Sequence, residues 1–331
     1  MGMRAVVLHE FGSPDVLRPE RIPVPAPGPG QVLVKVEAVG VGYAQTQMRG
    51  DRFPAPMWSP SLPLVLGGDV VGEVVRLGPG VPGTARVGAR VGAYTLLGAY
   101  AEYVAVDAAA LLPVPAELDA AVATAIPAPG PIAAGTLDAA RFRPGESVLV
   151  HAAAGGIGHL SVQLARRKGA GLVIGTAGGP ARAGFAAELG ADVAVDRHAG
   201  PWDDQVRAAT GGAGVDVILD SAGGRTLLEG IDLLAPRGRL VFYGSSGGGR
   251  DVPDVPLLKL LGMRSVTGFT LSGWRAARPK QFHAEHVELA SALLSEEVRH
   301  EIGATLPLSE AAEAHRLVES GMCPGRVVLT P

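Results

Sequence analysis

The chain has little of several residue types, and each shortage excludes a class of protein. Cys323 is the only cysteine among 331 residues, so an internal disulfide and a cluster of thiolate zinc ligands are both excluded. A chain with one thiol is compatible with a reducing compartment, which favours the cytoplasm. Residues 1–10 lack the basic and apolar segments of a signal peptide, in agreement with this expectation.

Concentrated charge and long apolar runs are also lacking. The net charge is -3, with both signs spread along the chain, whereas binding of a nucleic-acid backbone requires clustered basic residues. The apolar stretches are too short, or too interrupted by glycine and proline, to span a bilayer. With 47% hydrophobic and 18% charged residues, the chain is expected to fold as a globule that binds neither nucleic acid nor membranes.

The hydrophobic pattern predicts two kinds of domain. The N-terminal part has short segments rich in Val, Leu and Tyr between proline and glycine clusters, which is typical of an all-β unit. From Glu146 onward, apolar strands alternate with helical segments, which predicts parallel strands joined by crossover helices. The predicted strands are residues 147–151, 172–176, 193–195, 215–219 and 239–243, with residues 265–270 as a candidate sixth strand. The expected α/β architecture has a β-rich domain, residues 1–121 and 263–331, interrupted by a doubly wound parallel-sheet domain, residues 122–262.

A glycine-rich loop, Ala153-Ala154-Gly155-Gly156-Ile157-Gly158, follows the first parallel strand and opens a helix. Such a loop binds the diphosphate of a dinucleotide, because glycine lets the backbone approach the phosphates and the helix N-terminus offers free N–H groups. Ala153 stands where the usual pattern has its first glycine. A tight turn without a ligand is the alternative, and the strand–helix alternation around the loop disfavours it. The candidate cofactor-binding residues of the loop are Ala154, Gly155, Gly156 and Ile157.

The segment behind this loop favours NADPH over NADH. Sites for NAD usually carry an acidic residue about 20 residues after the loop, where it accepts a hydrogen bond from the ribose 2′-hydroxyl. No acidic residue occurs from Ser147 to Ala187, and Thr176 ends the second strand. Arg182 and Arg197 follow the second and third strands, where a guanidinium can bind a 2′-phosphate. Each arginine alone could be a solvated surface charge, and Asp196 beside Arg197 weakens the argument.

Further segments carry a resemblance to a known family. They are Gly67 to Val74 (GGDVVGEV), Gly98 to Tyr103 (GAYAEY), Val148 to Gly158 (VLVHAAAGGIG), Asp220 to Gly223 (DSAG) and Gly325 to Leu329 (GRVVL). In order and spacing they resemble the medium-chain dehydrogenase/reductase superfamily, most closely its zinc-independent NADPH:quinone oxidoreductase, or ζ-crystallin-like, branch. The resemblance implies a GroES-like β-barrel domain and a Rossmann domain, with the substrate held between them.

The resemblance also implies which residues lie beside the nicotinamide and which could hold a metal. Tyr243, Gly244, Gly268 and Phe269 are expected at the nicotinamide, although ordinary packing is an equal alternative for the tyrosine and phenylalanine side chains. Zinc-dependent relatives place cysteine in the segment that corresponds to residues 40–43, and histidine where Gly68 stands. Since neither ligand occurs here, we expect no metal site and a hydride transfer without zinc.

Gly42, Tyr43, Phe53 and Ile132 are the residues that the resemblance places in the substrate cleft. Gly42 stands where quinone reductases typically have asparagine, and Ile132 stands where they have threonine. Phe53 stands where related enoyl-thioester reductases have a tyrosine that donates a proton. Tyr43 is the nearest remaining phenol, and a buried aromatic of the barrel wall is its favoured interpretation. No catalytic acid is assigned, and water or the cofactor ribose could deliver the proton.

These observations together predict an NADPH-dependent oxidoreductase that passes hydride to a quinone or to an α,β-unsaturated carbonyl compound (an enone). An enoyl-thioester reductase and a non-catalytic NADPH-binding protein are the alternatives. Residues 263–270 could form an edge strand that pairs across a two-fold axis. We therefore expect a homodimer, unless the charge of Arg264 prevents pairing at this edge.

Overall fold

The computed structural model describes residues 2–52, 60–83, 85–246 and 253–331. It divides into two compact units, Met1–Pro129 with His286–Pro331, and Gly130–Glu285. The sequence predicted divisions at 121/122 and 262/263, whereas the units divide at 129/130 and 285/286. Residues 265–268 fall in the second unit because they pair in parallel with its neighbouring strand. The predicted cleft residue Phe53 lies outside the described residues.

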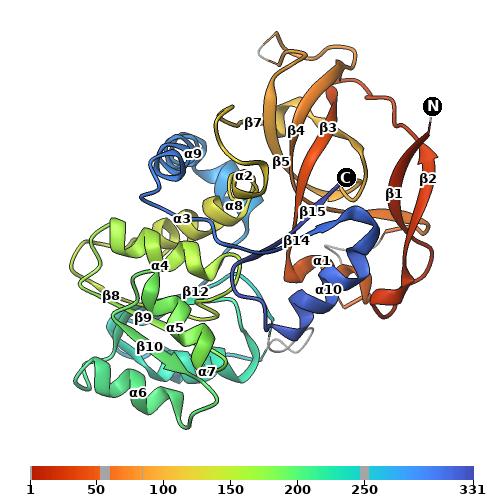
Figure 1. Cartoon of the computed structure of the whole chain (residues 1–331). Helices are drawn as coiled ribbons and strands as arrows, with labels where there is room; N and C mark the ends of the chain where they lie inside the picture. The colour runs from red at the N-terminus through yellow and green to blue at the C-terminus, as the bar shows by residue number, and fades with distance from the viewer. Residues whose placement is uncertain (1, 53–59, 84, 247–252) are drawn as a thin grey trace. The chain divides into compact units, whose positions relative to one another are not determined.

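The first unit is built on a nine-stranded, mostly antiparallel sheet, ordered β14-β15-β3-β4-β1-β2, in which β6 also pairs with β3, β5 with β4, and β7 with β5 (Figure 1). Its strands are β1 (Gly2–Leu8), β2 (Leu17–Pro23), β3 (Gln31–Val41), β4 (Leu64–Leu77), β5 (Arg90–Leu97), β6 (Tyr103–Asp107), β7 (Leu112–Pro113), β14 (Ile302–Pro307) and β15 (Arg326–Thr330). Valine and leucine of these strands form the core of the unit, to which Met48, Tyr100 and Leu308 contribute. The central strands β3 and β4 are buried along most of their length.

Two helices of the first unit meet through buried polar groups. α1 (Tyr43–Arg49) contacts α10 (Ala311–Ser320), which ends at the left-handed Gly321. His315 on α10 is fully buried, and its Nε2 lies 3.0 Å from the hydroxyl oxygen of Tyr100. Burial, and secondarily the Arg49 guanidinium, lowers the pKa of His315 to about 3. This imidazole is therefore neutral in the folded protein at every ordinary pH.

The second unit contains a six-stranded, all-parallel sheet in the order β10-β9-β8-β11-β12-β13. Its strands are β8 (Ser147–Val150), β9 (Leu172–Ala177), β10 (Val193–Asp196), β11 (Val215–Asp220), β12 (Leu234–Phe242) and β13 (Ser265–Gly268). Its helices are α4 (Gly158–Arg167), α5 (Pro180–Glu188), α6 (Trp202–Ala209), α7 (Gly224–Asp232) and α8 (Leu271–Ala277). The 129/130 division falls at the start of α3 (Pro129–Ala139), and the 285/286 division falls within α9 (Pro279–Leu294). This order confirms the predicted doubly wound sheet, whose switch point lies between β8 and β11.

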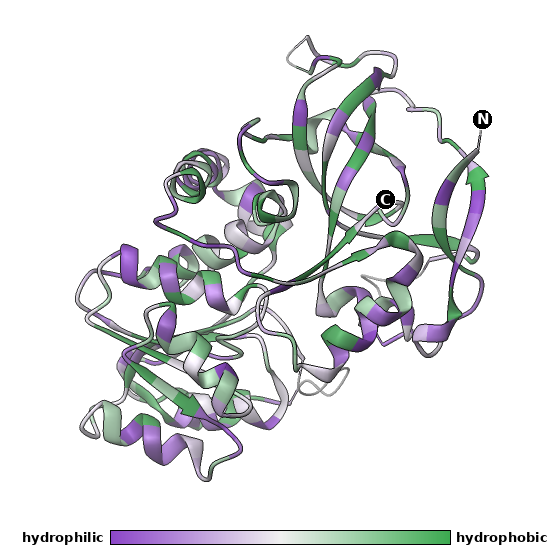
Figure 2. Ribbon diagram, viewed as in Figure 1, coloured by the Kyte–Doolittle hydropathy of each residue, from purple (hydrophilic) through white to green (hydrophobic). Residues whose placement is uncertain are grey.

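Strand composition explains this arrangement. The central strands β8 and β11 are buried along nearly their whole length, and the strands of this sheet are coloured mainly as hydrophobic in Figure 2. A strand covered by helices on both faces needs apolar residues at every position, which is the continuous pattern seen in the sequence. The short helix α2 (Ala120–Ala123) of the first unit is capped by Asp119, whose Oδ1 accepts from the amides of Ala121 and Val122.

The buried His315 predicts a loss of stability in acid. The unfolded chain takes up a proton at this side chain below about pH 6.5, whereas the folded protein does so only near pH 3. The free energy of unfolding should therefore fall as the pH drops from about 6.5 toward 3, by up to about 4 kcal/mol from this group. Chemical denaturation across this range should give a shallower pH dependence for His315→Gln. Substitution of the exposed His283 by glutamine should leave the slope as in the wild type, and parallel curves for wild type and His315→Gln would contradict the assignment.

Candidate functional site

The glycine loop joins the end of β8 to the start of α4 by a very close backbone approach. A Cβ atom on Gly158 would lie 2.1 Å from the carbonyl oxygen of Ala152, so only glycine fits there. Ala152 has a positive φ of 51°, and the amide of Ala153 donates to the carbonyl of Thr176 on β9 at 2.9 Å. The loop is thus tied to the neighbouring strand while α4 begins against it. This is the role of the last glycine in dinucleotide-binding turns.

The missing first glycine of the motif is compensated from the adjacent strand. Ala153 is fully buried, and a Cβ atom on Gly175 would lie 2.9 Å from the Ala153 Cβ. The missing side chain of Gly175 on β9 therefore provides the space that the Ala153 side chain occupies. Within the part of the chain that the structure describes, no hydrogen bond uses the amide N–H groups of Gly156 and Ile157 at the start of α4. These donors are available to an anionic ligand.

Two buried polar side chains that sequence reasoning missed lie at the switch point. His151 follows β8, and its Nδ1 lies 2.9 Å from the hydroxyl of Thr176, while burial lowers the pKa of His151. Asp220 ends β11, and its Oδ1 accepts from the amides of Ala222 and Gly223 at 2.7 and 2.8 Å. His151 Nε2 and Asp220 Oδ2 are buried without a hydrogen-bond partner among the described residues. Because Thr176 Oγ1 is occupied by His151, its predicted cofactor contact stays a prediction.

The predicted arginines lie in different surroundings. Arg182 Nε donates to the Gly178 carbonyl at 2.7 Å, and burial lowers the pKa of Arg182 while Asp196 opposes this. Asp196 accepts from the amides of Gly179 and His198 at 2.7 and 2.9 Å, and these bonds lower its pKa. Arg182 and Asp196 are thus brought together around the loop between β9 and α5. The Asp196 carboxylate is held by backbone amides, which moderates its repulsion of a phosphate.

Arg197 is instead directed toward α7. Its Nη2 donates to the Thr226 hydroxyl at 2.9 Å, and its guanidinium lies 5.9 Å from the centre of the Trp202 ring. Its Nε is buried without a hydrogen-bond partner among the described residues. Arg182 and Arg197 thus bond to different partners, the Gly178 carbonyl and the Thr226 hydroxyl, and their joint contact with a 2′-phosphate stays a prediction.

The residues predicted beside the nicotinamide lie after β12 and β13. Tyr243 follows β12, and burial raises its pKa to about 12, with the hydroxyls of Ser221 and Ser161 opposing the shift. A Cβ atom on Gly244 would lie 3.2 Å from the Ser221 carbonyl oxygen, so the backbone there is close to the end of β11. Gly268 is exposed at the end of β13. Phe269 packs against Trp274, with ring centres 6.2 Å apart, and against the backbone of Gly135.

In the first unit, a group of polar side chains surrounds Gly42. We call Gln45, Asp69, Tyr94 and Arg326 the Gly42 cluster. Gln45 Oε1 accepts from the Gly42 amide at 2.9 Å, and Arg326 Nη2 donates to Asp69 Oδ2 in a buried ion pair. A Cβ atom on Gly42 would lie 2.8 Å from Gln45 Oε1 and 3.3 Å from Arg326 Nη1. The amide and the guanidinium therefore occupy the space that a side chain at position 42 would need.

Charge and burial oppose each other within this cluster. Burial raises the pKa of Asp69 to about 6, although Arg326 opposes the shift. Burial, and secondarily the charge of Asp69, raises the pKa of Tyr94 to about 12. Asp69 Oδ1 and Arg326 Nε are buried without partners among the described residues. Sequence reasoning missed Asp69, Tyr94 and Arg326, since they come from β4, β5 and β15 and meet only through strand pairing.

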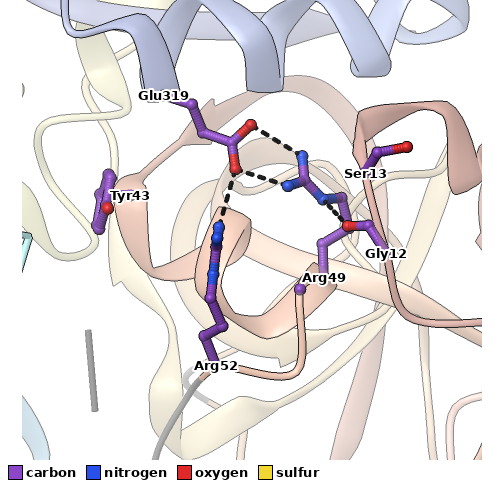
Figure 3. A pocket seen from close by; sticks show the side chains of 7 residues that line it. Gly12, Ser13, Tyr43, Arg49, Arg52 and Glu319 are labelled. Atoms are coloured by element: carbon purple, nitrogen blue, oxygen red, sulfur yellow. Dashed lines mark hydrogen bonds and ion pairs between the residues drawn. The ribbon is translucent and has the colours of Figure 1, made fainter. Parts of the chain in front are cut away.

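A polar pocket of about 490 Å³ lies next to Tyr43 (Figure 3). Its other lining residues are Gly12, Ser13, Arg49, Gly50, Arg52 and Glu319. Glu319 on α10 accepts from Arg49 at 2.6 Å and from Arg52 at 3.2 Å, and Arg49 Nε donates to the Gly12 carbonyl at 3.0 Å. Arg49 is buried, and its donors are used by Glu319 and Gly12. Through Arg49 and Glu319 this network connects α1 to α10. Tyr43 faces a pocket here, whereas the sequence favoured a buried position in the barrel wall.

Ile132, the remaining predicted cleft residue, lies half-buried on α3 at the start of the second unit. Neither Gly42 nor Gly68 offers a side-chain ligand, and no three His, Cys, Asp or Glu residues gather as a metal site within the described ranges. Among the same residues, no helix is both long and apolar enough to cross a membrane.

A doubly wound sheet with a glycine loop at its switch point, joined in one chain to an antiparallel barrel-like unit, defines a dinucleotide-binding oxidoreductase. Residues 28–116 match the alcohol dehydrogenase GroES-like domain, and residues 156–292 match the zinc-binding dehydrogenase family. The chain is 34% identical over 99% of its length to 98% of a 2-haloacrylate reductase of Burkholderia sp..

Solved structures agree with these matches. An Escherichia coli quinone oxidoreductase complexed with NADPH superposes with a TM-score of 0.91 at 30% identity, covering 99% of this chain and 100% of that one. A mycobacterial protein complexed with NADPH gives the same TM-score at 34% identity, again over 99% of this chain and 100% of the other. The chain therefore belongs to the medium-chain dehydrogenase/reductase family, in its quinone oxidoreductase branch. The predicted family and fold class are both confirmed.

The glycine loop yields a direct test of its backbone constraint. Gly158→Ala should force the loop or α4 to move and should lower the free energy of unfolding by about 1–3 kcal/mol. Gly184→Ala is the matched control, because Gly184 lies within α5 with nothing near its Cβ position, and it should raise stability by about 0.5–1 kcal/mol. Urea denaturation of both variants measures the difference. A Gly158→Ala protein as stable as the wild type would show that the close approach to Ala152 is not a real constraint.

Proposed function

We propose that this protein is an NADPH-dependent oxidoreductase that reduces a quinone or an enone without zinc. The observation that carries this proposal is the glycine loop at the switch point. Its amides at the start of α4 are free among the described residues, and the segment from Ser147 to Ala187 has no acidic residue. Two similar structures that contain NADPH support the choice of cofactor. The composition supports a cytoplasmic location.

The residues present fit this cofactor. The backbone of Ala154, Gly155, Gly156 and Ile157 would hold its diphosphate, and Thr176 would lie near its ribose. Arg182 would bind the 2′-phosphate at the β9–α5 loop, and Arg197 has a buried, unpartnered Nε with which to assist, as far as the described residues show. Tyr243, Gly244, Gly268 and Phe269 would flank the nicotinamide. When bound, NADPH supplies the hydride, and the protein supplies orientation and charge stabilisation.

The donor set of the first unit supports chemistry without zinc. Glycine at positions 42 and 68 leaves no thiolate or imidazole there, and the space at Gly42 is taken by Gln45 and Arg326. A conjugated acceptor needs no metal to accept hydride, because the charge it gains is spread over the enolate or the hydroquinone anion. The 2-haloacrylate reductase and the quinone oxidoreductase to which the chain is similar are both named for conjugated acceptors. Contacts of Gly42, Tyr43 and Ile132 with the acceptor stay predictions.

We also propose a homodimer that forms at the β13 edge. Leu257, Leu258, Leu261 and Met263 are exposed by 70–80% just before this strand, which ends the parallel sheet. Apolar side chains gathered beside an open strand edge are typical of a subunit interface. Arg264, the charge beside this strand, is half-buried, and Lys259 is paired with Asp232, which leaves much of the edge available for pairing.

The activity is tested by following the loss of NADPH absorbance with three acceptors: 1-octen-3-one, 9,10-phenanthrenequinone and crotonyl-CoA. We expect turnover of the enone or the quinone, unchanged by a metal chelator, and little turnover with NADH. Arg182→Ala should weaken NADPH binding about 10- to 100-fold, the loss expected for hydrogen bonds to a charged group, and should hardly affect NADH.

Arg207→Ala removes an exposed arginine from α6 of the same unit and serves as the control for this substitution. Turnover of crotonyl-CoA alone would indicate an enoyl-thioester reductase instead. Binding of NADPH without oxidation by any acceptor would indicate a non-catalytic protein.

The dimer is tested by sedimentation velocity. Wild-type protein should sediment as a dimer, and the double variant Leu258→Asp/Met263→Asp should sediment as a monomer, because buried charges at an interface are costly. Leu77→Asp is the control, since Leu77 is an exposed leucine at the end of β4 in the other unit. Monomeric wild-type protein at working concentration would refute the interface.

A further inference from the structure

His159 is a fully buried side chain that contacts the glycine loop from within α4. Its Nδ1 lies 2.8 Å from the carbonyl oxygen of Gly155, four residues earlier in the chain. A carbonyl has no proton to give, so the imidazole carries one on Nδ1 and donates it. Burial of an imidazole costs more than burial of an apolar side chain unless such a bond is made. The polar ring at this position is therefore tied to one atom of the loop.

The Gly155 carbonyl accepts a second hydrogen bond from the same residue. The backbone amide of His159 donates to it at 3.1 Å, as in an ordinary helical turn. A carbonyl oxygen has two lone pairs, so these two donors fill its capacity. Both donors belong to α4, and the carbonyl is thus held toward the body of the helix.

This orientation fixes the direction of the Gly156 amide. Gly155 and Gly156 share one peptide unit, and a trans peptide is planar, with its C=O and N–H pointing in opposite directions. Because the carbonyl points into α4, the Gly156 N–H points out of the start of the helix. No hydrogen bond of the described residues uses this N–H. It is one of the donors that would hold the diphosphate of the cofactor.

The peptide unit between two glycines needs such a restraint. Glycine adopts a wide range of φ and ψ angles, and here it stands on both sides of the unit. Rotation of the unit by half a turn would direct its carbonyl oxygen at the phosphates and its N–H away from them. A bond that is formed before the ligand arrives removes the cost of ordering this unit from the free energy of binding.

The His159 ring is itself held in place by α5. Its centre lies 6.3 Å from that of the Phe185 ring, and the two planes are inclined by 55°. A contact between rings at this distance favours one orientation of the imidazole. Phe185 lies on the same helix as Arg182, the residue proposed for the 2′-phosphate. The imidazole therefore lies between the glycine loop and the helix that carries this arginine.

We infer that His159 is a positioning residue for the diphosphate of NADPH. This inference rests on the proposed function, in which the loop amides hold that diphosphate. The imidazole acts through the backbone: it sets the orientation of the peptide unit between Gly155 and Gly156, and the Gly156 amide then donates to a phosphate oxygen. The glycines of the loop provide the space for the phosphates, and the histidine that follows them determines the direction of the donor.

The test compares His159→Leu with His159→Asn. Both new side chains carry two atoms on Cγ, close to the places of Nδ1 and Cδ2 of histidine, but only asparagine has an N–H donor there. Isothermal titration calorimetry should give a Kd for NADPH that rises about 3- to 10-fold in His159→Leu, the loss expected for one hydrogen bond, and that stays within about twofold of the wild type in His159→Asn. Adenosine 2′-monophosphate, which lacks the diphosphate, should bind both variants as it binds the wild type.

Gln163→Leu is the matched control on the same helix. Gln163 Nε2 donates to the carbonyl of His159 at 2.9 Å, so it makes the same kind of bond to a carbonyl four residues back, one turn farther from the loop. Its loss should leave the Kd for NADPH as in the wild type. His159→Phe covers the case in which His159→Leu is poorly folded, because phenylalanine keeps a ring against Phe185 and also lacks the donor. It should show the same weakening of NADPH binding.

Three results would overturn the inference and leave the proposed function intact. The first is an unchanged Kd for NADPH in His159→Leu and His159→Phe. The second is an equal loss of NADPH and adenosine 2′-monophosphate, which would indicate a general role in packing. The third is a His159→Asn protein that binds NADPH as weakly as His159→Leu. Wild-type protein that does not bind NADPH would overturn both the inference and the proposed function.

Discussion

A buried ion pair between Asp69 and Arg326 organises the first unit around Gly42. It joins β4 to β15, which are far apart in the sequence, at a place where both side chains are almost completely buried. Removing either partner would leave the other charge buried and unpaired, at a cost of about 3–5 kcal/mol. The pair also requires glycine at position 40, because a Cβ atom there would lie 2.7 Å from Arg326 Nε and 2.8 Å from its Nη2. At position 42 a Cβ atom would lie 2.8 Å from Gln45 Oε1 and 3.3 Å from Arg326 Nη1.

In the second unit, too, glycines allow close contacts that a side chain would prevent. Gly158 allows α4 to begin against the Ala152 carbonyl, and Gly175 makes room for Ala153. In both units the space left by a glycine is filled by a group of another strand or loop rather than by solvent. The loop at the switch point thereby keeps amide donors available for phosphates, while its own geometry is fixed by contacts to β9. Preorganised donors of this kind need no rearrangement when a ligand binds.

The sequence predicted the features that depend on local pattern. Continuous apolar runs predicted the parallel strands, and the candidate strand at 265–270 is confirmed by β13. The sequence placed the second domain border at 262/263, before β13, because the local pattern does not reveal which sheet this strand joins. Arg182 lies at the predicted loop, but Arg197 turns toward Thr226, and nothing in its neighbours along the chain reveals this. The Gly42 cluster could not be predicted for the same reason. Strand pairing joins distant parts of the sequence, and it is this pairing that brings Tyr94 opposite Asp69.

Positions 42 and 68 are glycine and carry no side-chain ligand, and the space beside Gly42 holds Gln45 and Arg326. Zinc-dependent relatives stabilise an oxyanion with a divalent cation, which needs thiolate and imidazole ligands in the segment that contains Gly42. A guanidinium in this space supplies a permanent positive charge without a ligand set, since arginine keeps its proton at any working pH. It is a weaker electrophile than zinc, so it suits acceptors whose conjugation already spreads the charge. The chemistry proposed for the chain thus follows from which group fills the space at Gly42.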